Sequence, residues 1–207
     1  MNPHEIFVQN KFKEVSKLIN PNSKILDIGC NDCSIINFLK QPIYYGVDGD
    51  KEIINKSKER NIRVECIDLN KEKLPFENIK FDYILMLDIL EHIVNPSNLI
   101  KNSIDRLDNN GEIIITLPND YHLLNKIRFL FNKHLTENPF AQYGHLHYFP
   151  IKSGEQFLKK NGLKIIKKII LSPTKPAFFP DIIKDTLAKL LPQSFARDIL
   201  YLTEPIS

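Results

Sequence analysis

The sequence predicts an α/β fold in which helices cover both faces of a mostly parallel sheet. Short runs rich in Ile, Val and Tyr alternate with longer stretches of helical periodicity, which is the pattern of βαβ units. The run FDYILML (81–87) is apolar almost throughout, as expected of a central strand that is covered on both faces. A length of 207 residues with 43% apolar residues suits a single domain over 1–207.

The first half of the chain predicts four strands with helices between them. Helical spacing of Ile, Phe, Val and Leu near the N-terminus indicates the first helix, and the first strand ends in a turn. The expected elements are a helix over 4–19, a strand over 24–29, a helix over 34–40, a strand over 44–48, a helix over 51–60, and strands over 62–68 and 81–87.

The second half predicts three more strands. Asn95 as N-cap and Pro96 at the first helical position begin a helix that ends before the turn Asn109-Asn110-Gly111. Ser153 and Gln156 have the spacing of a capping box. The expected elements are a strand over 112–118, helices over 121–133 and 153–161, a strand over 163–171, a helix over 181–191, and a strand over 198–204.

Composition excludes several classes of protein. No apolar run approaches about 18 residues, which argues against a transmembrane helix, and the acidic, amphipathic N-terminus does not resemble a signal peptide, so we expect a cytoplasmic protein. The net charge of +3 is spread along the chain, which argues against a nucleic-acid binder. Three cysteines do not make a disulfide framework, and Cys30-x-x-Cys33 lacks a second ligand pair for zinc, so we interpret it as packing.

Acidic residues end three successive predicted strands. Ligands of open α/β sheets bind outside the carboxyl ends of the strands, where Asp27-Ile28-Gly29, Asp48 and Asp68 lie in this sequence. A glycine turn admits a ligand close to the backbone, and an acid ending the second strand can accept hydrogen bonds from both ribose hydroxyls. An acid ending the third can accept from an adenine amino group, with Leu69 against the ring. Each acid alone could be a turn former, but three in this order favour a nucleoside site.

These segments resemble class I S-adenosylmethionine-dependent methyltransferases over nearly the whole chain. ILDIGC is similar to the first family motif, GVDGD to the ribose-binding acid, FDYILMLDILEHIVNP to the strand-four signature and GEIIITLPN to the strand-five signature. GHLHYFPIKSGEQFLKKNGLKI is similar to the segment before strand six in small-molecule enzymes, including ubiquinone-pathway, methionine-biosynthesis-associated and polysaccharide-cluster methyltransferases. The resemblance implies a Rossmann-like seven-stranded sheet of order 3-2-1-4-5-7-6, with the last strand antiparallel.

The resemblance also implies roles for individual residues toward S-adenosylmethionine. Asp27 and Gly29 would shape the pocket for its methionine part, Asp48 would bind the ribose and Asp68 the adenine. The backbone near Leu87 would line the methyl-donor side. The family's second and third glycines are Asn31 and Cys33 here; Asn tolerates left-handed geometry and Cys is small, so we expect the turn to be preserved.

Histidines supply the candidates for acid–base chemistry. His92 follows strand four near the expected methyl position, and His145 and His147 lie in a loop expected to cover the pocket. Each is a candidate base or, alternatively, a structural or surface histidine. Asp88-x-x-Glu91-His92 with His145 or His147 downstream has the ligand types for a divalent cation. The Leu-Glu-His string also occurs in many relatives without metal, and we expect no metal.

Residues 119–150 and 172–196 are the elaborations expected to form the substrate side. The stretch 123–135 combines Leu, Ile and Phe with Lys and Arg, which suits a lid helix or a helix lying on a membrane surface. We therefore expect methyl transfer from S-adenosylmethionine to a small-molecule acceptor, most readily a hydroxyl oxygen, by a monomer or homodimer. The alternatives are a non-catalytic partner subunit and an RNA 2′-O-methyltransferase; a dehydrogenase is disfavoured because G-x-G-x-x-G is incomplete.

Overall fold

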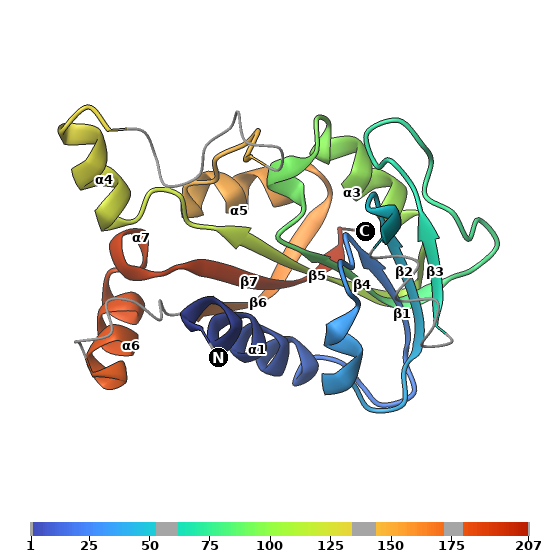
Figure 1. Cartoon of the computed structure of the whole chain (residues 1–207). Coiled ribbons are helices and arrows are strands. Elements are labelled where there is room, and N and C mark those ends of the chain that lie inside the picture. The colour runs from blue at the N-terminus through green and yellow to red at the C-terminus, as the bar shows by residue number, and fades with distance from the viewer. Residues whose placement is uncertain (1, 53–61, 134–143, 172–179, 207) are drawn as a thin grey trace.

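Seven strands form one sheet in the computed structural model, which describes residues 2–52, 62–133, 144–171 and 180–206 (Figure 1). The strands are β1 Lys24–Ile28, β2 Ile43–Asp48, β3 Arg63–Cys66, β4 Phe81–Leu87, β5 Leu107–Pro118, β6 Leu163–Leu171 and β7 Asp198–Pro205. Their order is β3-β2-β1-β4-β5-β7-β6, and only β7 runs antiparallel to its neighbours. The predicted fold class and strand order are confirmed.

Helices lie on both faces of this sheet. They are α1 Pro3–Ser16, α3 Pro96–Ile104, α4 Leu123–Leu130, α5 Ile151–Lys160, α6 Asp181–Leu190 and α7 Pro192–Phe195, with 3-10 turns η1 Ser34–Phe38 and η2 Leu90–His92. Figure 1 shows α3 and α5 on one face and α1 on the other, while α4, α6 and α7 gather at the end beyond β5 and β7. None of the helices within the described ranges is long and apolar enough to cross a membrane.

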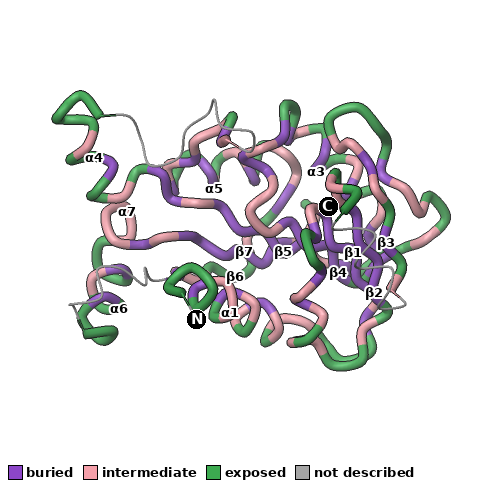
Figure 2. Tube along the Cα trace, in the orientation of Figure 1, coloured by how far each residue is buried: buried purple, intermediate pink, exposed green. Residues whose placement is uncertain are grey.

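Alternating side chains of the strands build a separate core on each face. Ile84 of β4 packs in one cluster with Leu99 of α3, whereas its neighbour Leu85 packs in the other cluster with Phe7 of α1. Figure 2 shows the inner strands β1, β2, β4 and β7 largely buried between the two layers, whereas the edge strands β3 and β6 are more exposed. This double coverage explains why the predicted strands read as continuous apolar runs rather than alternating ones.

Local signals placed most helices correctly, with three corrections. Asn95 caps α3 as predicted, since its side chain accepts the Asn98 N–H at 3.1 Å. The helix expected over 34–40 is instead the short 3-10 turn η1, because left-handed Cys33 precedes it and extended Leu39 ends it. The capping box at Ser153 is wrong, because α5 already begins at Ile151 and the Gly154 N–H donates to Pro150 O. The short helix α7 was not predicted.

The turn predicted at Asn109-Asn110-Gly111 lies within β5. Pairing of β5 with β4 jumps from Phe81↔Leu107 to Tyr83↔Glu112, so the residues between them form an irregularity inside one long strand. Gly111 fits because a Cβ there would lie 2.8 Å from Phe81 O. The turn residues therefore mark a bulge rather than a strand end.

Parts of three predictions lie outside the described residues. The helix expected over 51–60 is described only at its first two positions, and 134–143 and 172–179 belong to the two predicted elaborations. What remains of these elaborations is α4 in the first and α6 with α7 in the second.

Candidate active site

The turn after β1 contains three residues in the left-handed region. Gly29, Asn31 and Cys33 have φ values of 77°, 47° and 54°. The N–H groups of Gly29 and Cys30 both donate to Val47 O, at 2.9 and 3.1 Å, which ties the turn to the end of β2. A Cβ at Gly29 would lie 2.8 Å from the Ile89 side chain. The turn thus keeps its left-handed geometry without the second and third glycines.

Cys30 and Cys33 are buried inside this turn. Their sulfur atoms are 3.1 Å apart, and the Cys33 thiol donates to Cys30 Sγ. Both belong to the core cluster beneath α1, which agrees with the packing interpretation of the Cys-x-x-Cys spacing.

Asp48 ends β2 directly beside this turn. Its carboxylate accepts the Asn31 N–H at 2.8 Å and the Asp50 N–H at 3.0 Å. The side chain is half-buried, so it remains open to solvent while two backbone donors fix its direction. Because each carboxylate oxygen has two lone pairs, both oxygens retain acceptor capacity.

Asp68 and Leu69 follow β3, and Leu87 ends β4. The Asp68 carboxylate pairs with Lys71 Nζ at 2.8 Å, and the hydrogen bond from Lys71 holds its pKa below the usual range. Leu69 and Leu87 are half-buried, packed against the cores of opposite faces. The three residues therefore lie at the carboxyl edge of the sheet, as predicted.

Asp27 is buried beneath this edge rather than exposed on it. Its carboxyl accepts the Tyr44 hydroxyl at 2.5 Å. Burial raises the pKa of Asp27 to about 7, although the bond from Tyr44 opposes the shift. This carboxyl is thus bonded to β2 within the core rather than open to solvent.

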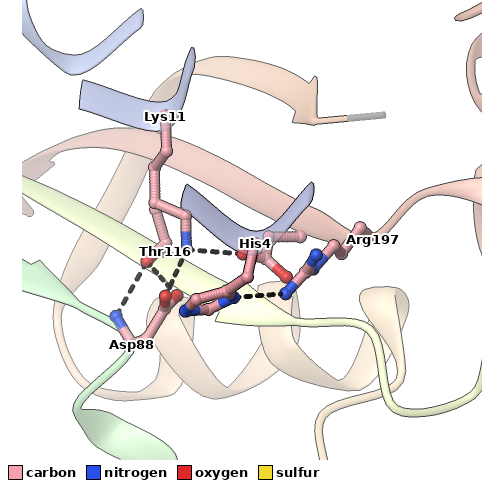
Figure 3. A network of polar contacts seen from close by, with 6 residues as sticks. His4, Lys11, Asp88, Thr116 and Arg197 are labelled. Carbon is pink, nitrogen blue, oxygen red and sulfur yellow. Dashed lines mark hydrogen bonds and ion pairs between the residues drawn. The ribbon is translucent and has the colours of Figure 1, made fainter. Parts of the chain in front are cut away.

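A charge network joins α1 to the ends of β4 and β7 (Figure 3), in which Lys11 and Asp198 are buried and Asp88 is partly exposed. Lys11 is only 3% exposed and pairs with both Asp88 and Asp198, the latter at 2.6 Å. Burial disfavours the Lys11 ammonium, but the two carboxylates outweigh it and raise its pKa. We call Lys11, Asp88 and Asp198 the lysine cluster.

Asp88 has its own backbone support within the lysine cluster. It adopts a left-handed φ of 52°; its N–H donates to Thr116 Oγ1 at 2.8 Å, and that hydroxyl donates to Asp88 Oδ1 at 2.6 Å. Burial raises the pKa of Asp88, but the charge of Lys11 and the hydrogen bonds from Lys11 and Thr116 lower it by more, so the pKa lies below its usual range. Asp88 is thus engaged by Lys11 and not by the candidate histidines. Figure 3 also shows His4 beside Arg197, with His4 Nδ1 and Arg197 Nη2 3.2 Å apart.

The histidines form a second cluster, made from three separate segments. His92 of η2 and His145 of the loop before α5 have ring centroids 5.0 Å apart. His145 Nδ1 lies 3.1 Å from both oxygens of Asp120, which follows β5. Ligand atoms of Glu91, His92 and His145 all lie within 4.8 Å of one another. We call Glu91, His92, His145 and Asp120 the histidine cluster.

Backbone bonds hold the histidine cluster in place. The N–H groups of Leu146 and His147 donate to Glu91 O at 2.8 and 3.1 Å, and His92 Nδ1 lies 3.2 Å from Gly144 O. His147 turns away, with Nε2 2.9 Å from Ile93 O. Of the two candidate histidines in this loop, the structure therefore brings only His145 to His92.

The Glu91 carboxyl is the unusual member of the histidine cluster. It is 1% exposed, and neither oxygen has a hydrogen-bond partner in the described part of the chain. Burial raises its pKa well above the usual range, and the charge of Asp88 adds to the shift.

Sequence reasoning missed Lys11, Asp198 and Asp120. Lys11 shares one helix face with buried Phe7 and Val15, so a cation in the apolar stripe was the available signal. Asp120 follows the fifth strand at the edge where ligands bind, but its partner His145 lies 25 positions away, so its role was not predicted. Asp198 carries no comparable signal.

Known proteins resemble this chain in sequence and in structure. The ubiquinone biosynthesis O-methyltransferase of Coxiella burnetii is 27% identical over 128 residues, which are 58% of this chain and 54% of that protein. The Haloferax volcanii putative methyltransferase solved with the Trm112 activator has a TM-score of 0.67 at 11% identity, over 97% of this chain and 90% of that one. A Mesorhizobium loti S-adenosylmethionine-dependent methyltransferase has a TM-score of 0.64 at 16% identity, over 92% and 95%.

The chain spans about half the length of the Coxiella relative. The two solved structures have the same fold as this chain. The family model described as "Methionine biosynthesis protein MetW" matches residues 9–190, which is most of the chain. With its seven-stranded order of 3-2-1-4-5-7-6, the chain therefore has the class I S-adenosylmethionine-dependent methyltransferase fold and belongs to the MetW family.

Proposed function

We propose that this chain transfers the methyl group of S-adenosylmethionine to a hydroxyl oxygen of a small molecule and releases S-adenosylhomocysteine. The observation that carries the proposal is Asp48, fixed by two backbone N–H groups beside a left-handed turn at the carboxyl edge of the sheet. The family and the fold support the cofactor. The relative named for O-methylation in ubiquinone biosynthesis favours a hydroxyl acceptor.

The residues at this edge fit the cofactor by their chemistry. Asp48 would accept the ribose hydroxyls, while Gly29 and Asn31 shape the turn and Asp27 lies buried behind them, bonded to Tyr44. Asp68 would accept the adenine amino group, because its exposed pairing with Lys71 is a weak competitor. Leu69 would cover the adenine ring, and the backbone at Leu87 would line the side of the methyl donor.

The bound cofactor supplies an electrophilic methyl group, so the chain itself must align the acceptor and manage its proton. His92 and His145 are our candidate catalytic residues, one of which takes the hydroxyl proton. Asp120 accepts a hydrogen bond from His145 Nδ1, which orients that imidazole and assigns the basic role to Nε2.

Calorimetric titration with S-adenosylmethionine and S-adenosylhomocysteine tests the cofactor site. We expect micromolar binding that weakens at least tenfold in Asp48→Asn, because a neutral amide then replaces the charged acceptor of the ribose hydroxyls. The exposed Asp108→Asn is the matched control and should bind as the parent does. Absence of binding at millimolar cofactor would overturn the proposal.

A screen of phenolic and aliphatic alcohols with radiolabelled methyl donor then tests the acceptor. We expect labelled ether product with at least one alcohol, reduced at least tenfold in His92→Ala or His145→Ala. Transfer to amines or to RNA instead of alcohols would contradict the hydroxyl assignment.

The second candidate is a non-catalytic partner subunit. Phe129, Leu130 and Phe131 at the end of α4 are 73%, 79% and 72% exposed, an apolar surface that suits a protein or membrane contact. A structural neighbour of this chain was solved with an activator protein. This candidate leads if cofactor binding fails while the protein remains folded. Cytoplasmic location and a monomeric or homodimeric state are parts of our main proposal.

A further inference from the structure

The histidine cluster has the donor set of a metal site, and we propose that Glu91, His92 and His145 bind a divalent transition metal such as Zn²⁺. The proposal deepens the proposed function and rests on it. With the ion bound, the cation would hold the acceptor oxygen and favour loss of its proton in place of a histidine base, because an Nε2 lone pair that binds metal cannot also take a proton. Two imidazoles and one carboxylate, with a position left for an oxygen ligand, are the set found in catalytic zinc and non-haem iron centres.

Three observations point to these ligands. Their candidate atoms lie within 4.8 Å of one another, close enough to share one ion. The Glu91 carboxyl is 1% exposed and without a hydrogen-bond partner among the residues described, and a buried carboxylate in that state is costly unless a cation satisfies it. The sheet edge beside it already carries the residues proposed to bind the methyl donor.

The surroundings also prepare both imidazoles for a metal. Asp120 accepts the Nδ1–H of His145, and Gly144 O accepts the Nδ1–H of His92. Each bond fixes the tautomer in which Nε2 carries the basic lone pair, the arrangement usual for metal-binding histidines. Asp120 is therefore a positioning residue for His145.

The ligand set differs from the one that the sequence suggested. Asp88 had the right spacing to join Glu91 and His92, but the structure engages it with Lys11 and Thr116. The ligands that remain are Glu91, His92 and His145, which are one oxygen donor and two nitrogen donors. Two nitrogen ligands favour Zn²⁺ over Mg²⁺, which prefers oxygen.

The test measures metal binding directly, without activity. Protein stripped with chelator is titrated with Zn²⁺ and with Mg²⁺ by calorimetry, and Co²⁺ serves as an absorbance probe of nitrogen ligation. We expect one Zn²⁺ per chain, at least tenfold weaker Mg²⁺, and visible Co²⁺ bands. Absence of saturable Zn²⁺ binding, or Mg²⁺ as tight as Zn²⁺, would overturn the proposal.

Variants locate the ion. Glu91→Gln and His145→Ala should each weaken Zn²⁺ at least 100-fold, and Asp120→Asn by about 10–100-fold because it only orients His145. The control His147→Ala lies in the same loop but contacts Ile93 O, and its affinity should stay within twofold. Thermal unfolding of each metal-free variant checks folding. Folded Glu91→Gln and His145→Ala proteins that still bind Zn²⁺ would assign the ion elsewhere and overturn the proposal.

S-adenosylmethionine titration of the same proteins separates the two proposals. Folded Glu91→Gln protein that binds the cofactor but not Zn²⁺ supports the metal site. Wild-type protein that binds Zn²⁺ but not the cofactor supports the metal site as well, and overturns only the proposed methyl transfer.

Discussion

The lysine cluster and the histidine cluster lie close together in the fold, yet they satisfy their charges in opposite ways. In the lysine cluster Lys11 stands between two carboxylates, and Thr116 completes the bonds of Asp88. In the histidine cluster the Glu91 carboxyl has no partner in the described ranges. A cluster whose charges are paired within the chain serves the folded state by itself, whereas one with a buried acid that lacks a partner calls for something outside the chain.

Removing Lys11 should have the largest effect on stability. Lys11→Met leaves Asp198 buried without its cation, so we expect the free energy of unfolding to fall by about 3 kcal/mol in urea denaturation. Lys13→Met on the exposed side of α1 is the control and should stay within about 0.5 kcal/mol. A loss below about 1 kcal/mol would show that the lysine cluster is not what fastens α1.

Asp27 is an intermediate case, a buried acid with one neutral partner, Tyr44. Its pKa is raised to about 7, so the folded protein keeps a proton that the unfolded chain releases near its ordinary 3.8. Folding stability should therefore fall as pH rises from about 4 to about 7, by an amount on the order of a few kcal/mol. Denaturation curves across this range should show a shallower fall in Asp27→Asn.

Some of that fall should remain in the Asp27→Asn protein. Asp198, whose pKa burial raises to about 6, contributes a dependence of the same sign. Asp108→Asn, at an exposed site, should reproduce the parent curve. A parent protein whose stability rises over this range would contradict the burial argument for Asp27.

Glu91→Gln should have the smallest effect. The amide occupies the same space, and no hydrogen bond within the described chain is lost, so we expect a change below about 1 kcal/mol in metal-free protein. Chemical denaturation with chelator present measures it. A loss as large as that of Lys11→Met would erase the contrast between the two clusters, because it would reveal a partner for the carboxyl.

The parts of the site that the sequence predicted are those built from one strand and the turn that follows it. Asp48 and Asp68 end their strands, so the parallel sheet alone brings them to one edge. The strand order came from family resemblance, since periodicity does not say which strands pair. Asn31 shows a backbone conformation that residue preference anticipated.

Contacts between distant segments account for the rest. His145 meets Asp120 across 25 positions, and Lys11 meets Asp88 across 77, so no local pattern relates them. Ser153 illustrates the converse error, because a correct capping spacing lost to a helix that starts two residues earlier. Tertiary packing decided these cases, and local propensity did not.

The double hydrogen bond to Glu91 O has an evolutionary consequence. Because the peptide groups of Leu146 and His147 anchor the loop to η2, the position of residue 145 beside residue 92 depends on main-chain atoms. The side chains at positions 92 and 145 can then be exchanged without displacing the backbone that carries them. Single substitutions at positions 92 and 145 should therefore change the chemistry without displacing the loop, and laboratory evolution of new acceptor specificity should begin there.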